Sequence, residues 1–100
     1  MQTTLERIQN WYFENCDGEW EHTYQVKIET LDNPGWTIMI DLEETYLENL
    51  AFSKEFQNSV TEDDWYVFRV ESKKLQIACG PKNLEQVLII FLDEVIQNRN

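Results

Sequence analysis

Apolar and polar side chains alternate in two runs between residues 22 and 42. Inward positions in the first run are His22, Tyr24, Val26 and Ile28, and in the second they are Trp36, Ile38, Ile40 and Leu42. A period of two is typical of strands in a sheet with one solvated face. Residues 31–35 between the runs form a turn, in which Pro34 fixes φ and Gly35 is expected to supply a positive φ. We therefore predict a hairpin with a loop longer than two residues.

A second hairpin is predicted over residues 65–79. Residues 65–71 and 75–79 have strand character, and Ser72-Lys73 forms the turn between them. Because residues 65–71 carry apolar groups on both faces, we expect this strand inside the sheet and partly covered on each side. Residues 43–64 have no clean period. We expect a short strand near residues 46–52, followed by a polar loop to Asp64.

A helix is predicted at each end of the chain. Thr3 and Glu6 have the spacing of a capping box, which begins a helix over residues 3–15. At the other end, Asn83 with Gln86 is expected to cap a helix over residues 84–97. Its buried stripe consists of Leu84, Val87, Leu88, Phe91, Leu92 and Val95. Three further isoleucines, Ile89, Ile90 and Ile96, widen this stripe, and they indicate either a deeply buried helix or a self-association surface that makes a homodimer.

These elements predict an α+β fold. An antiparallel sheet of four or five strands carries the N-terminal and the C-terminal helix on one face. The chain has 100 residues, of which 42% are hydrophobic and 13% aromatic, and no linker or repeat divides it. We therefore expect a single domain over residues 1–100.

Several features of the sequence favour the cytoplasm. The N-terminal segment lacks the pattern of a secretory signal, and the longest apolar run, Val87 to Leu92, is far shorter than the ~20 residues that span a bilayer. Cys16 and Cys79 lie far apart in the sequence, which favours reduced thiols over a disulfide. We expect no contact with a membrane.

The net charge of −11 is concentrated in one part of the chain. Residues 14–64 hold fourteen acidic side chains and two basic ones, whereas residues 1–13 are neutral and residues 65–100 have a net charge of +1. A single acidic residue only solubilises a surface. Fourteen in half the chain are expected to create a negative field that repels nucleic acid and anionic lipid and attracts basic proteins.

The sequence lacks the patterns that catalysis or metal binding requires. A zinc site needs three or four ligands at short paired spacings, and Cys16, His22 and Cys79 do not have that spacing. The inward phase of His22 favours a structural histidine. No phosphate-binding glycine loop or nucleophile elbow is present, and adjacent acids are expected by chance among nineteen. We expect no enzyme activity, no cofactor and no metal.

Two tryptophans, Trp20 and Trp65, are flanked by acidic residues. Such an aromatic either covers a small core or anchors an interface whose surrounding acids pair with a partner's Lys or Arg. On the second interpretation, the predicted partner-binding residues are Glu19, Trp20, Glu21, Asp41, Glu43, Glu44, Asp63 and Asp64.

Several sequence blocks resemble the immunity protein 53 family of bacterial polymorphic toxin systems. The blocks are Trp11-Tyr12, Cys16-Asp17-Gly18-Glu19-Trp20-Glu21-His22, Thr30-Leu31-Asp32-Asn33-Pro34-Gly35-Trp36, Ile40-Asp41-Leu42, Asp64-Trp65, and Gly80-Pro81 with Asn83-Leu84. The similarity covers nearly the whole chain except residues 43–60. It implies a cytoplasmic antidote that binds and neutralises a cognate toxin, commonly a nuclease with a basic active site. The motif from Cys16 to His22 is either part of the toxin-binding site or a structural corner in which Gly18 turns the chain and Glu21 or His22 bonds backbone.

Two other functional classes remain open at this stage. An acidic nucleic-acid mimic that regulates a host DNA-binding protein shares the charge argument but not the motifs. A small hydrolase or metal-dependent enzyme would use the region of Glu21 and His22.

Overall fold

The computed structural model describes residues 1–97, and these form a five-stranded antiparallel sheet with helices at both ends of the chain. The helical elements are α1 (Thr4–Asn15), α2 (Trp20–Thr23), α3 (Leu84–Ile90) and the π-helical turn η1 (Phe91–Val95). The strands are β1 (Val26–Leu31), β2 (Gly35–Asp41), β3 (Lys54–Gln57), β4 (Trp65–Glu71) and β5 (Lys74–Cys79). Their spatial order is β1-β2-β5-β4-β3. The predicted α+β class is confirmed.

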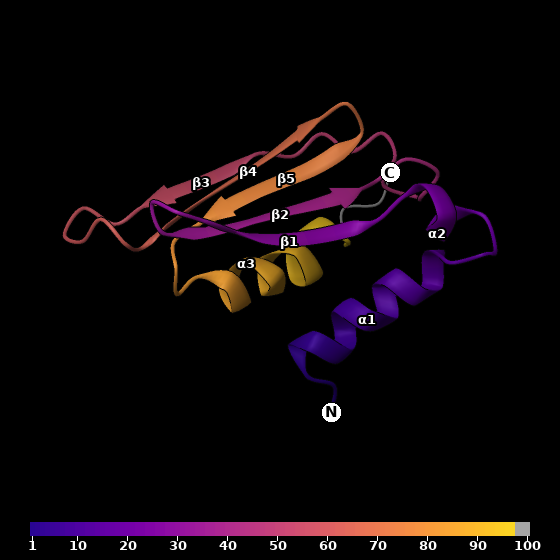
Figure 1. The fold of residues 1–100 in the computed structure, drawn as a ribbon, viewed down its shortest axis with the longest axis horizontal. Coiled ribbons are helices and arrows are strands. Elements are labelled where there is room, and N and C mark those ends of the chain that lie inside the picture. Colours follow the sequence, from indigo (N-terminus) through magenta and orange to yellow (C-terminus); the bar gives the residue numbers. More distant parts are fainter. Residues whose placement is uncertain (98–100) are drawn as a thin grey trace.

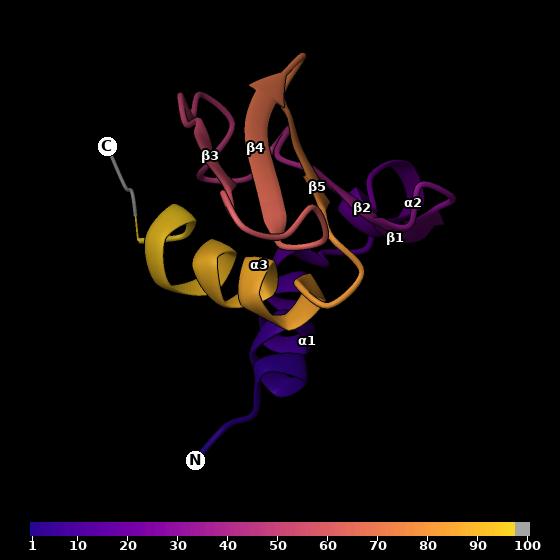
Figure 2. The same cartoon turned by 90° about the vertical axis from the view of Figure 1, so that its left-hand side faces the viewer.

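The molecule has two layers, because the long helices lie on one face of the sheet (Figures 1 and 2). Alternate residues of the three central strands point towards these helices and are buried, among them Ile38, Phe68 and Ile77. They meet the apolar stripe of the C-terminal helix, in which Phe91 is fully buried. The ring of Trp11 in α1 packs edge-on against the Phe91 ring, with the ring centroids 5.2 Å apart. Within residues 1–97, no helix has the length and apolar character needed to cross a membrane.

Both predicted hairpins are present, and their registers follow the alternation in the sequence. Val26 pairs with Ile40 in the first hairpin and Val70 with Leu75 in the second. The turn between β4 and β5 is tight, with positive φ at Ser72 (54°) and Lys73 (61°). Two positive φ values give the backbone twist that two-residue hairpin loops favour.

The prediction of a positive φ at Gly35 is wrong, since Gly18 is the glycine with that conformation among the described residues. Gly35 has a different role. A Cβ at this position would overlap the carbonyl oxygen of Cys79 on the neighbouring strand. Glycine therefore permits the close approach of β2 and β5 at this end of the sheet.

Two local assignments from the sequence are wrong. Residues 20–23 form α2 and not the start of a strand, so His22 is exposed and not an inward structural histidine. Residues 46–49 form turns, residues 50–52 have no regular structure, and the short strand is β3 at Lys54–Gln57. In both places apolar side chains contact the core without belonging to a strand, from the helical turn α2 and its C-cap in the first case and from non-strand backbone in the second.

The N-terminal capping box is confirmed. The Glu6 backbone N–H donates to the Thr3 hydroxyl, and the Thr3 backbone N–H donates to the Glu6 carboxylate. The C-terminal helix begins after Asn83 as expected, but the Asn83 side chain does not cap backbone amides. It donates to the carboxylate of Asp64 and to Gln86 instead. Of the isoleucines expected to widen the apolar stripe, Ile90 is buried in the core, as a deeply packed helix requires, whereas Ile89 is 37% exposed. Homodimerisation through this helix stays a prediction.

Candidate partner-binding surface

The motif from Cys16 to His22 folds into a hydrogen-bonded corner between α1 and α2. Gly18 adopts a φ of 92°, and the Glu21 carboxylate accepts bonds from the backbone N–H groups of Asp17 and Gly18, each at 3.0 Å. The Asp17 carboxylate accepts from the N–H groups of Glu19 and Trp20, both at 2.9 Å. These two backbone donors lower the pKa of Asp17. The structural interpretation of this motif therefore accounts for Asp17, Gly18 and Glu21.

The corner inserts Trp20 into the core. Its side chain is only 3% exposed and packs edge-on against Trp11 and Tyr12, with ring centroids 6.4 and 6.0 Å away. The indole N–H donates to the carbonyl of Glu43 at 2.9 Å. Trp20 thus covers a small core and presents no exposed surface for the predicted role of interface anchor.

The loop after β2 lies beside this corner and adds further carboxylates. The bond from Trp20 to Glu43 and a 3.3 Å bond from the Tyr24 hydroxyl to the Glu44 carboxylate join the two segments. Partial burial, reinforced by the carboxylates of Glu43 and Glu44, raises the pKa of Tyr24 to about 12. Burial and nearby negative charge both disfavour the phenolate, so the hydroxyl keeps its proton.

We call this part of the surface the acidic end. It consists of Asp17, Glu19, Glu21, Glu43, Glu44 and Glu48, all of them exposed or half-buried. Within residues 1–97, its one ion pair joins Lys73 to Glu48 at 3.7 Å. The other five carboxylates have no basic ion-pair partner there and leave the negative charge largely uncompensated.

Asp41 lies next to the acidic end but is only 4% exposed. One carboxylate oxygen accepts from the Gln25 backbone N–H at 2.9 Å, and the other pairs with the Lys74 ammonium at 2.5 Å. The side chain closes the end of the first hairpin and offers no free carboxylate to a partner.

Asp63 and Asp64 lie at the opposite end of the sheet. Asp64 precedes β4, and its carboxylate accepts from the side-chain amides of Asn58 and Asn83 at 3.0 and 2.8 Å, which lowers its pKa. Asp63 is exposed. At ~3.3 Å per residue, the ladder places these residues about 20 Å from Asp41. The predicted residues therefore divide between two ends of the sheet.

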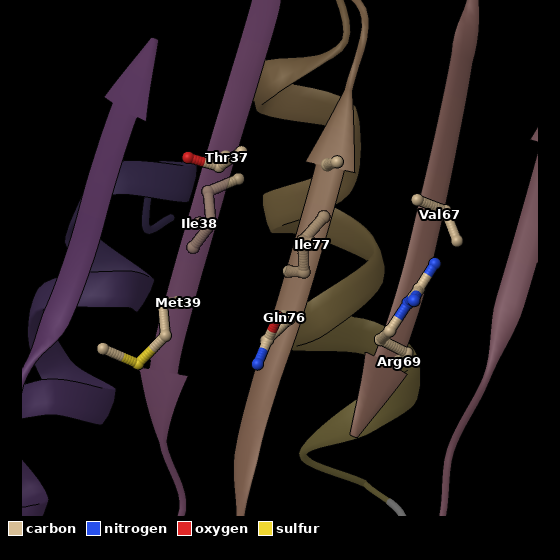
Figure 3. Close-up of a pocket in the computed structure, with 8 residues that line it drawn as sticks. Thr37, Ile38, Met39, Val67, Arg69, Gln76 and Ile77 are labelled. Carbon is tan, nitrogen blue, oxygen red and sulfur yellow. The ribbon is translucent and has the colours of Figure 1, made fainter. Parts of the chain in front are cut away.

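The sheet face opposite the helices was not singled out in the sequence. Figure 3 shows its centre, where Thr37, Met39, Gln76, Val67 and Arg69 line a shallow depression of about 320 Å³ with the helices behind the strands. Among residues 1–97 no element covers this face, so β4 is covered on one side and not on both as expected. The sequence feature that indicates this face is the same alternation that predicted the strands. The positions that point away from the helices carry both polar and apolar residues.

The described residues contain no group of three His, Cys, Asp or Glu side chains arranged to hold a metal ion. Cys16 and Cys79 are free thiols, and burial raises the pKa of Cys79 to about 11. His22 is exposed, while the neighbouring Glu21 carboxylate is bonded to backbone N–H groups. This arrangement does not pair a general base with a nucleophile.

Comparison with protein-family models confirms the resemblance seen in the sequence. The model of immunity protein 53 matches residues 5–96, which is nearly the whole chain. The chain belongs to the immunity protein 53 family. An immunity role and a toxin as partner follow from that membership, and immunity proteins generally bind and do not catalyse. The comparisons with curated proteins and with solved structures found no match.

Proposed function

We propose that this protein neutralises its cognate toxin by direct binding through the acidic end. The observation that carries the proposal is the convergence of two distant segments, the α1–α2 corner and the loop after β2, into one group of six carboxylates with a single ion pair among residues 1–97. The proposed contacts are Glu19, Glu43 and Glu44. Glu21 supports them by fixing the corner.

The chemistry of this surface favours a basic partner. A negative field attracts a positively charged surface and speeds its diffusional encounter, and complementary charges fix the orientation of the complex. A toxin that cleaves nucleic acid has such a surface, because its active site must attract a polyanion. We therefore propose a nuclease-like toxin whose substrate cleft, or a site beside it, receives the acidic end.

Three double variants test the location of this surface. Glu19→Lys with Glu44→Lys reverses the acidic end, Glu62→Lys with Asp63→Lys reverses the opposite end, and Glu55→Lys with Glu85→Lys is the matched control. Every substituted residue is exposed, and each pair changes the net charge by the same amount.

The measurements are toxin protection in co-expressing cells and association kinetics with the purified toxin. We expect the first pair to slow association by about tenfold or more at low ionic strength, with the difference shrinking as salt rises. The control pair should change association far less. Equal losses in all three variants would show that only net charge matters, and a loss confined to the second pair would move the site to Asp63. Equal toxicity with and without the native protein would refute neutralisation itself.

A further inference from the structure

Strand β1 is an open edge of the sheet. The strand order places it at one border, where it pairs with β2 alone (Figure 1). Four consecutive residues, Lys27 to Thr30, have exposed side chains. An edge of this kind presents backbone groups that can pair with another strand.

The hydrogen-bond pattern identifies which backbone groups face outward. The Asp41 N–H donates to the Gln25 carbonyl, so these two residues form a hydrogen-bonded pair of the antiparallel ladder. Such pairs alternate along the ladder, and Lys27 and Glu29 are therefore the next residues whose backbone groups point to β2. The N–H and C=O groups of the residues between and beside them, Val26, Ile28 and Thr30, point away from the sheet.

The side chains of this edge are mutually complementary. Lys27 and Glu29 stand on the uncovered face of the sheet, and neither forms an ion pair within residues 1–97. Ile28 points to the other face and is 43% exposed. The edge thus places an exposed apolar side chain between two opposite charges that have no ion-pair partner within residues 1–97.

We propose that β1 is a self-association edge that pairs antiparallel with β1 of a second copy, about a two-fold axis at Ile28. In that register Ile28 faces its own copy, and Val26 stands opposite Thr30. Lys27 stands opposite Glu29 twice, once on each side of the axis. A two-fold contact must be self-complementary, and this segment satisfies that condition in charge.

Charged edge residues also have a protective role, because Lys on an edge strand discourages pairing with foreign strands. Protection requires only that charge be present. Self-pairing requires that the charges at positions 27 and 29 be opposite, and charge exchange separates the two explanations.

The experiment measures mass by analytical ultracentrifugation over about 10 to 500 µM protein at an ionic strength of about 0.15 M, where long-range repulsion between acidic chains is screened. The native chain of 12.0 kDa should approach twice that mass as concentration rises. Lys27→Glu and Glu29→Lys should each weaken dimerisation about tenfold, because each replaces two attractive pairs by two repulsive ones. The double variant Lys27→Glu/Glu29→Lys should recover the native dissociation constant.

Net charge cannot mimic this result. Lys27→Glu makes the chain more negative and Glu29→Lys makes it less negative, so general repulsion predicts opposite effects for the two single variants. Glu55→Lys on the other edge strand, β3, is the matched control and should leave dimerisation unchanged. A native chain that stays at 12.0 kDa throughout, single variants that dimerise as well as the native chain, or a double variant no better than the singles would each overturn the proposal.

Discussion

Replacing Trp20 with alanine separates the two roles that its acidic neighbours suggested. An interface anchor would lose toxin binding and keep its stability. The structure instead places Trp20 in the core, 3% exposed, with its ring against those of Trp11, Tyr12 and Tyr24 and its N–H on the Glu43 carbonyl. The main effect of Trp20→Ala should therefore be a lower free energy of unfolding.

The magnitude follows from burial. Truncation of a fully buried Trp to Ala costs about 3 to 5 kcal/mol, from lost transfer free energy and the cavity that remains. For a domain of this size, 1 kcal/mol lowers Tm by roughly 4 to 8 °C, so we expect a decrease of at least about 12 °C. Urea unfolding followed by circular dichroism should show the same loss as a lower midpoint with an unchanged m-value.

Two variants calibrate this measurement. Trp20→Phe keeps an aromatic ring but removes the bond to Glu43, and we expect a loss well below that of Trp20→Ala. Phe13→Ala removes an exposed aromatic side chain from α1 and should stay within about 0.5 kcal/mol of native. If the free energy of unfolding of Trp20→Ala lies within about 1 kcal/mol of the native value, the core role is refuted, since removal of a buried Trp costs more than that.

Three further predictions concern other parts of the molecule. Gly80→Ala should lower the free energy of unfolding by about 1 to 3 kcal/mol or more in urea titrations, because the new Cβ would collide with the backbone carbonyl of Asp63. The pKa of Asp64 is lower in the folded than in the unfolded state, so its stabilising contribution is present above the unfolded value of ~3.9 and is lost as pH falls through the folded value. Asp64→Asn should thus be less stable than native at pH 7, with the difference narrowing in acid-unfolding curves. Burial raises the pKa of Cys79 to about 11, so a thiol reagent near pH 8 should modify Cys16 before Cys79 in the folded protein. In urea the two thiols should react at equal rates. Equal rates in the folded protein would contradict the burial of Cys79.

The sheet's two hairpins were predictable because their signals are local. Alternation over 26–31 and 35–41 fixes which side chains face the core, and the turn at Ser72-Lys73 fixes the register of the strands that flank it. The short α2 was missed for a physical reason. His22 and Tyr24 happen to continue the alternation of β1, while the backbone is held in a helical turn by the carboxylates of Asp17 and Glu21.

The partner-binding residues were harder to predict, because acidic side chains have no hydrophobic period that reveals their direction. Sequence neighbours of similar composition have different environments here. Asp41 is buried against Lys74, whereas Glu44, three residues later, is exposed at a positive φ of 62°. Counting charges along the sequence identified the acidic half of the chain. It did not reveal that the folded sheet places these acidic residues at two opposite ends.

The amino-acid sequence by itself determined the two hairpins, the two terminal helices and the capping box, since all of these depend on residues close together in the chain, and its motifs identified the family. Only the tertiary structure decided that Trp20 is a core residue, that Asp63 and Asp64 lie far from Glu43, and that β1 is an edge. Strand order and burial are set by contacts between distant segments, whose free energies depend on the packing of the whole core.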